Sequence, residues 1–69
     1  MISKLKAARE KAGLTQEQLA EKAGVARQTI LFLEKGQYNP SLRLVFKLST
    51  ILKVPVEELF SFSDEFGKK

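Results

Sequence analysis

The sequence contains no cysteine and no histidine. Without cysteine there are no disulfide bonds or thiolate metal ligands, and without histidine there is no imidazole ligand and the commonest catalytic base is missing. No phosphate-binding loop motif is present either. Glu57 and Glu58 are adjacent, so on a helix they point about 100° apart and cannot act as an acid–base pair. We therefore expect no enzyme and no metal, cofactor or small-molecule ligand.

Long apolar runs are also missing. No stretch approaches the roughly 20 apolar residues of a membrane-spanning helix, and the N-terminus lacks the apolar region of a signal peptide. The sequence therefore predicts a soluble, cytoplasmic protein with no membrane partner. Its 69 residues make one domain. A chain of this size buries only about 60% of its unfolded surface, so we expect modest stability unless chains pair.

The charge is unevenly distributed along the chain. Residues 1–53 hold ten Lys or Arg and four Asp or Glu, giving +6, while residues 54–69 hold two Lys and four acids, giving −2; together they give the net charge of +4. A basic body with an acidic end suits a polyanionic partner. On charge alone, a surface that serves only solubility is an equally good interpretation.

Apolar residues recur at helical spacing, which predicts an all-α fold of five helices with little or no strand. The expected helices span residues 2–12, 16–23, 27–35, 42–52 and 56–60. The fourth is apolar nearly all round and is expected to be the most buried, and Pro55 suits the start of the fifth. Phe60 and Phe62 alternate with serines, which fits either an added strand or a frayed end.

Residues 16–35, QEQLAEKAGVARQTILFLEK, are the most informative stretch. Thr15 and Gln18 form a capping box that starts a helix at residue 16. Gly24 ends that helix because glycine adopts the left-handed conformation without steric cost. A second helix with Ile30 and Leu33 on its inner face follows. Two helices joined by a tight glycine turn are the unit that places a helix in the major groove of DNA.

Longer stretches match a family pattern. G-L-T-Q-E-Q-L-A stands at 13–20, G-V-A-R-Q-T-I at 24–30, L-E-K-G at 33–36, Y-N-P-S-L at 38–42 and V-P-V-E-E-L-F at 54–60. With these residues the chain resembles the phage repressor and Cro-type helix-turn-helix family, also called the Xre family, over roughly residues 2–60. The resemblance implies a compact five-helix, lambda-repressor-like domain at 1–60, with its helix-turn-helix at 16–35 and a tail at 61–69. It also implies double-stranded DNA and a second copy of the chain as partners.

The second helix of this unit has an outer face that can meet base edges. Arg27 can fork onto guanine and Gln28 can pair with adenine, each good pair giving about 1–3 kcal/mol of discrimination. Arg27 can equally hold a phosphate. Thr29 lies at the edge, within reach of a phosphate or a thymine methyl. Leu31 and Phe32 can contact thymine methyls, pack under the following loop or serve a protein partner. The predicted base contacts are Arg27, Gln28, Thr29 and Leu31.

Phosphate contacts are implied on both sides of that helix. The family clamps a phosphate at the position of Gln16, where the first N–H groups and the dipole of a helix favour an anion. The loop after the second helix lies against the neighbouring phosphates. The contacts implied there are Lys35, Tyr38, Asn39, Ser41 and Arg43. Such contacts set the position on DNA and the salt dependence, not the sequence preference.

Arg9 and Glu34 are implied to form a partly buried ion pair that fixes the orientation of the second helix. Such a pair is a specificity device more than a source of stability, because desolvation cancels much of the attraction. Ala26 departs from the pattern, since the family usually carries Ser or Thr there. The second helix therefore starts without a side-chain cap.

The sequence thus predicts a sequence-specific DNA-binding transcriptional regulator, with repression as the favoured activity, that reads a pseudo-palindromic operator through residues 27–35 as a homodimer. The alternative is an antitoxin-like or adaptor protein-interaction module on the same fold, which uses Leu31, Phe32 and the aromatic tail. Apolar residues at 54, 56, 59, 60, 62 and 66 predict a C-terminal dimerisation surface. Packing of Phe60 and Phe62 onto the monomer core is the other interpretation.

Overall fold

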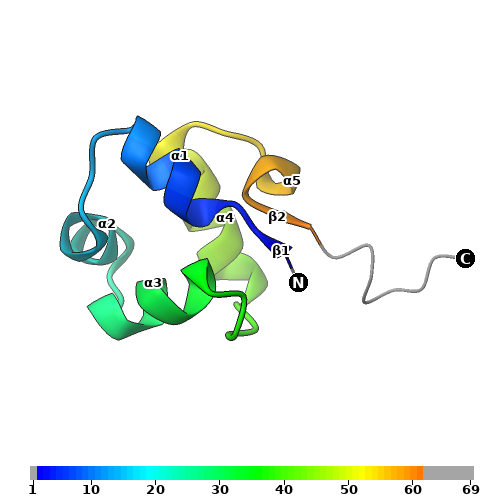
Figure 1. Cartoon of the computed structure of the whole chain (residues 1–69), viewed down its shortest axis with the longest axis horizontal. Helices are drawn as coiled ribbons and strands as arrows, with labels where there is room; N and C mark the ends of the chain where they lie inside the picture. Colours follow the sequence, from blue (N-terminus) through cyan, green and yellow to red (C-terminus); the bar gives the residue numbers. More distant parts are fainter. Residues whose placement is uncertain (1, 62–69) are drawn as a thin grey trace, which may run out of the picture.

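The computed structural model describes residues 2–61, which fold into five helices and two short strands (Figure 1). In chain order these are β1 Ile2–Ser3, α1 Leu5–Lys11, α2 Gln16–Ala23, α3 Arg27–Glu34, α4 Leu42–Leu52, α5 Val56–Leu59 and β2 Phe60–Ser61. The five predicted helices are present, and the fold class is the one that the sequence predicted. Of the predicted tail, residues 62–69 lie outside the described residues.

The start of the chain differs from the prediction of a helix over residues 2–12. That helix begins only at Leu5, because β1 pairs with β2 in an antiparallel sheet in which Ile2 lies opposite Ser61. The backbone N–H of Lys4 then donates to the carbonyl of Leu59 at 2.8 Å. The same pairing ends α5 one residue earlier than predicted. The pairing of two segments that are far apart in the sequence therefore decides where α1 begins and where α5 ends.

Local hydrogen bonds set the boundaries of α2 and α4. Thr15 Oγ1 accepts from the N–H of Gln18 at 3.0 Å, and the Gln18 side chain accepts from the N–H of Thr15 at 2.9 Å. Gly24 ends α2 with φ 71°, in the left-handed region. Ser41 Oγ accepts from the N–H of Leu44 at 3.1 Å and caps α4. The predicted capping box, glycine stop and serine cap are all present.

The hydrophobic core lies where the five helices meet. Its buried residues are Leu5, Leu19, Ala20, Ala23, Ile30, Leu33, Leu44, Val45, Leu48, Leu52, Leu59 and Phe60. Leu59 and Phe60 are buried inside one chain, so they do not belong to the predicted C-terminal dimerisation surface, and for Phe60 the other interpretation, packing onto the monomer core, is confirmed. Phe62 and Phe66 of that predicted surface lie outside the described residues. Val54 and Val56 are half-buried against the same core. A small domain has few large apolar side chains to fill its interior, and these are needed there.

α4 is buried on fewer sides than its nearly all-round apolar pattern predicted. Its inner side packs into the core, but Leu42 is 70% exposed and Phe46 is 55% exposed. They lie one turn apart, so their side chains are neighbours on one side of the helix. Thr50, one turn further, folds its hydroxyl back to donate to the carbonyl of Phe46 at 3.0 Å. We refer to Leu42, Phe46 and Thr50 as the α4 strip.

Candidate nucleic-acid interface

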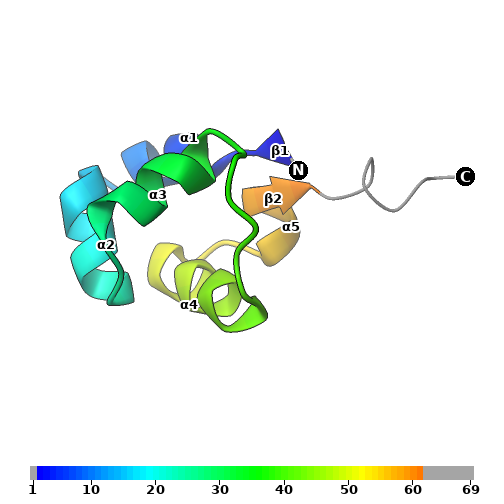
Figure 2. The same cartoon turned by 90° about the horizontal axis from the view of Figure 1, so that it is seen from below.

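The helix-turn-helix unit consists of α2, a turn at residues 24–26, and α3. α3 lies along the lower edge of the molecule in Figure 1 and faces the viewer in Figure 2. Ile30 and Leu33 are fully buried and fix α3 against the rest of the domain. Arg27 and Gln28 are exposed at its start, and Thr29 is half-buried beside them. The outer face of α3 is therefore open along the edge of the domain.

Two apolar side chains share this outer side. Leu31 is half-buried, whereas Phe32 is 36% exposed. Phe32 stands one turn after Gln28, so both lie on one side of α3. The N–H of Gln37 donates to the carbonyl of Phe32 at 3.0 Å and holds the end of the helix. About a third of Phe32 is therefore exposed as an apolar surface beside Gln28.

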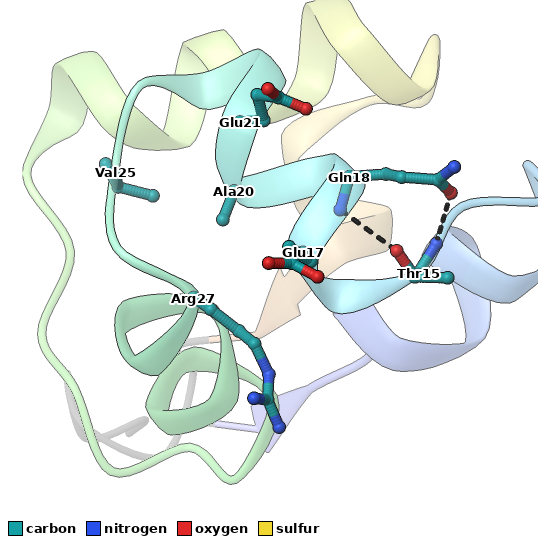
Figure 3. Close-up of a pocket in the computed structure, with 7 residues that line it drawn as sticks. All are labelled: Thr15, Glu17, Gln18, Ala20, Glu21, Val25 and Arg27. Atoms are coloured by element: carbon teal, nitrogen blue, oxygen red, sulfur yellow. Dashed lines mark hydrogen bonds between the residues drawn. The ribbon is translucent and has the colours of Figure 1, made fainter.

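Arg27 borders a hollow of about 500 Å³ between α2 and the start of α3 (Figure 3). Glu17 and Glu21 of α2 also line this hollow, with Ala20 and Val25 at its apolar side. In Figure 3 the Arg27 side chain extends away from Glu21 and Val25. The carboxylates of Glu17 and Glu21 make the hollow itself a poor place for a phosphate, because like charges repel. The same two carboxylates do not repel the uncharged edge of a base.

A second hollow, of about 350 Å³, lies between the turn of the helix-turn-helix and the start of α4. Its polar lining consists of Thr29, Tyr38, Ser41, Arg43 and Lys47. Two cations, three hydroxyl groups and the N-terminus of α4 meet there, which is the chemistry that binds a phosphate group. The hydroxyl of Ser41 accepts the capping bond of α4 but keeps its own hydrogen to donate.

The structure divides the phosphate contacts predicted around the loop after α3 into two groups. Tyr38, Ser41 and Arg43 share this second hollow, which we call the phosphate hollow after the contact predicted for it, whereas Lys35 and Asn39 are exposed and do not line it. Sequence reasoning missed Lys47, which lines the hollow and donates from Nζ to the carbonyl of Ala23 at 3.1 Å. Its spacing of four residues from Arg43, which puts both on one side of α4, was the signal available.

Gln16 is the first residue of α2, and its side chain reaches α3. Gln16 Nε2 donates to Glu34 Oε1 at 3.0 Å, and the other carboxylate oxygen of Glu34 accepts from Arg9 Nε at 2.6 Å. The side chains of Arg9 and Glu34 are only 9% and 5% exposed. The ion pair implied by the resemblance is therefore present and nearly dry. Because Glu34 ends α3 and Thr29 is near its start, Gln16 and the phosphate hollow lie towards opposite ends of the helix.

A helix-turn-helix family model matches residues 5–59, which includes all five helices. The chain belongs to the helix-turn-helix family. As a helix-turn-helix protein of the Xre type, it is a DNA-binding transcriptional regulator, and double-stranded DNA is its partner. None of its described helices combines the length and apolar character needed to cross a bilayer. Within residues 2–61, the acidic side chains form no group that could hold a metal ion.

Three known proteins resemble this helix-turn-helix regulator along most of its length. An HTH-type transcriptional regulator of Archaeoglobus fulgidus is 52% identical over 65 residues, which are 94% of this chain and 93% of the relative. The transcriptional repressor RstR of the cryptic phage CTXphi, from Vibrio cholerae, is 40% identical over 62 residues, 90% of this chain but 56% of RstR. The crystal structure of SinR, the master regulator for biofilm formation, in complex with DNA has a TM-score of 0.69 and 39% identity, and the likeness covers 77% of this chain and 86% of that chain.

Proposed function

We propose that the protein represses transcription by placing α3 in the major groove of a pseudo-palindromic operator as a homodimer. The observation that carries this proposal is the open outer face of α3, with Gln16 at one end and the phosphate hollow at the other. A helix is narrow enough to enter the major groove, and donors on both sides of it can hold the two flanking backbones.

Base reading rests on the start of α3. Gln28 is exposed and its carboxamide can bond adenine at two atoms. For Arg27 we favour guanine over phosphate, because Glu17 and Glu21 line the same hollow. Thr29 and Leu31 are the proposed thymine-methyl contacts.

Binding of the DNA backbone rests on positively charged side chains and hydroxyl groups. Arg43 and Lys47 each neutralise a phosphate in this proposal, and each such contact releases a counterion from DNA, which makes affinity fall with added salt. Tyr38 and Ser41 add hydroxyl donors to the same hollow. Lys35 and Asn39 are proposed to reach the phosphate next along the backbone, since both are exposed around the loop that precedes α4. These contacts fix register rather than sequence.

We propose the α4 strip as the contact between the two copies. Leu42 and Phe46 are the most exposed large apolar side chains among the described residues, and a two-fold contact would bury both strips against each other. Leu42 and Phe46 belong to α4 and not to α3, so a contact made through them leaves the outer face of α3 free for DNA in this proposal. The same two-fold axis then relates two half-sites about one helical turn apart.

Repression is the favoured activity because a protein seated in the major groove excludes others from the same site. The similarity to the repressor RstR supports this choice. Binding to chromosomal DNA also agrees with the predicted cytoplasmic location.

Selection from random duplex DNA, followed by mobility-shift titration of the recovered sites at two salt concentrations, tests the base-reading surface. We expect a two-fold symmetric consensus and a loss of preference at one base pair per half-site in Gln28→Ala. Gln37→Ala is the matched control, because Gln37 is an exposed glutamine beyond the end of α3. Failure to enrich any sequence, or equal selectivity of Gln28→Ala and wild type, contradicts the proposal.

Sedimentation of Phe46→Ser tests the contact between copies. We expect a shift to monomer and weaker binding to the complete operator, with affinity for an isolated half-site unchanged. Ile2→Ser is the matched control, since Ile2 is another apolar side chain that is 53% exposed, but in β1. An unchanged dimer in Phe46→Ser would rule out the α4 strip as the interface.

A further inference from the structure

A chain of side-chain hydrogen bonds connects the core to the first residue of α2. Arg9 Nη1 donates to the carbonyl of Leu14 at 2.7 Å, and Arg9 Nε donates to Glu34 Oε2 at 2.6 Å. Glu34 Oε1 accepts from Gln16 Nε2 at 3.0 Å. α1, the loop before α2, α2 itself and α3 are thereby held together through four residues. This series of hydrogen bonds ends at the side chain of Gln16, for which a phosphate contact is proposed.

The chemistry of the carboxylate fixes the orientation of the Gln16 amide. An ionised carboxylate only accepts hydrogen bonds, so it selects the NH₂ side of the carboxamide and excludes the flipped orientation. One N–H of that NH₂ group is used by Glu34, and the second remains free to donate. The backbone N–H of Gln16, in the first turn of α2, has no acceptor four residues earlier in the helix. Two donors on one residue are thus available to an anion at the start of α2.

We propose that Glu34 is a positioning residue for DNA binding: it orients the Gln16 carboxamide so that its second N–H meets a phosphate. This inference rests on the proposed phosphate contact of Gln16. A glutamine side chain has several rotatable bonds, and ordering it during binding opposes association. Holding the amide in advance removes that cost. Gln16 then bridges two acceptors, the carboxylate of Glu34 and the phosphate.

Arg9 has a separate part in this arrangement. A nearly buried carboxylate close to the DNA backbone would repel a phosphate if its charge were not compensated, and burial weakens the screening by solvent. The guanidinium of Arg9, at 2.6 Å, cancels that charge. Arg9 therefore permits a carboxylate to serve as the anchor of an anion-binding amide. The ion pair is both a connection between α1 and α3 and the support of a DNA contact.

The deciding experiment replaces the pair without leaving a buried charge. Arg9→Met/Glu34→Leu fills the site with apolar side chains, a type of exchange that is often neutral for stability. We expect operator affinity to fall about tenfold in Gln16→Ala and by a similar factor in the pair variant. The triple variant is then no weaker than the pair variant, because the Gln16 contact is already lost.

The results that would overturn the positioning role of Glu34 differ from the result that would count against the proposed function. If Gln16→Ala costs the same factor in the wild-type and pair-variant backgrounds, Glu34 acts only on the fold and the positioning role is overturned. The role is also overturned if the wild type selects an operator and Gln16→Ala binds it as tightly as wild type does. Failure of the wild type to select any operator counts against the proposed function itself.

A measurement on the wild type decides the question if the pair variant does not fold. Nuclear magnetic relaxation of side-chain NH₂ groups in the DNA-free protein should find the Gln16 amide rigid. Gln28 and Gln37, both exposed, serve as internal controls and should move freely. A Gln16 amide as mobile as these two overturns the positioning role.

Discussion

Lys47 on α4 donates a hydrogen bond from Nζ to the carbonyl of Ala23, the last residue of α2, at 3.1 Å. The carbonyls at the end of a helix have no partner within the helix, and a cation there also interacts favourably with the helix dipole. Lys47 thus ties α4 to the point where the helix-turn-helix bends at Gly24. It also lines the hollow in which the proposed phosphate contacts gather.

Lys47→Met should therefore lower both stability and DNA affinity. We expect a loss of about 0.5–1 kcal/mol in the free energy of unfolding, from one hydrogen bond at a helix end. The slope of log affinity against log salt should also become shallower by about one unit, because one phosphate contact is lost. Urea denaturation and salt titration measure the two effects. Lys22→Met, an exposed lysine on α2, is the control and should change neither by as much; equal effects in both variants would contradict the assignment.

Breaking the Arg9–Glu34 pair on one side only should be costly. Arg9→Met leaves the nearly buried carboxylate of Glu34 without its cation, and we expect a loss of about 3–5 kcal/mol in the free energy of unfolding. Equilibrium denaturation in urea is the measurement. Lys11→Met changes an exposed cation of the same helix and should cost far less. A loss below about 1 kcal/mol in Arg9→Met would mean that the site admits water and compensates the charge.

Substitutions of Arg43 and of Gln28 should affect DNA binding in different ways. Arg43→Ala should weaken binding to all sequences alike and reduce the salt slope by about one unit, whereas Gln28→Ala should relax the preference at one base pair and leave the slope unchanged. Binding to the selected operator and to its single-base variants at several salt concentrations separates the two. A change of sequence preference in Arg43→Ala would move this residue from the backbone to the base edges.

Ala26→Ser should stabilise the protein. Ala26 is the N-cap of α3, with φ −71° and ψ 149°, and it offers no side-chain hydrogen bond. Serine adopts the same backbone conformation and supplies the missing acceptor, for a gain of about 1 kcal/mol. Thermal unfolding checks it. Ala7→Ser, at an exposed position inside α1, is the control and should be slightly destabilising because serine is a weaker helix former.

Lys53 is the one described non-glycine residue with a positive φ, 60°, at the end of α4. The left-handed conformation is unfavourable for a residue with a Cβ atom, so Lys53→Gly should gain about 0.5–1 kcal/mol in the free energy of unfolding. Lys53→Ala keeps the Cβ atom and should gain nothing. The same melting experiment compares the two, and a larger gain in the alanine variant would indicate that the lysine side chain, not the backbone, is unfavourable.

Features that depend on neighbours in the sequence were predictable. The capping box of Thr15, the stop at Gly24 and the cap of Ser41 each involve residues within a few positions of one another. The residue types of such a short segment are enough to predict its helix caps and stops. The Arg9–Glu34 pair joins two helices that are far apart in the sequence, so its prediction came instead from the family resemblance.

Features that depend on what lies across the domain were not predictable. The apolar pattern of α4 cannot tell which of its sides has a neighbour, so the exposure of Leu42 and Phe46 appears only in the fold. The hydrogen bonds of Gln16 with Glu34 and of Lys47 with Ala23 join residues far apart in the chain. The strand at Ile2 needs a partner that lies at the other end of the described chain.

The pairing of β1 with β2 has a consequence for attached domains. Paired strands lie about 4.8 Å apart, so a protein fused before Ile2 and one fused after Ser61 would leave the domain from nearly the same point. Figure 1 shows that point at the far end of the molecule from α2. Both ends of the described chain therefore lie together at one end of the domain. A fluorescent label or a tether can be joined before Ile2 or after Ser61, in both cases at a distance from the start of the helix-turn-helix.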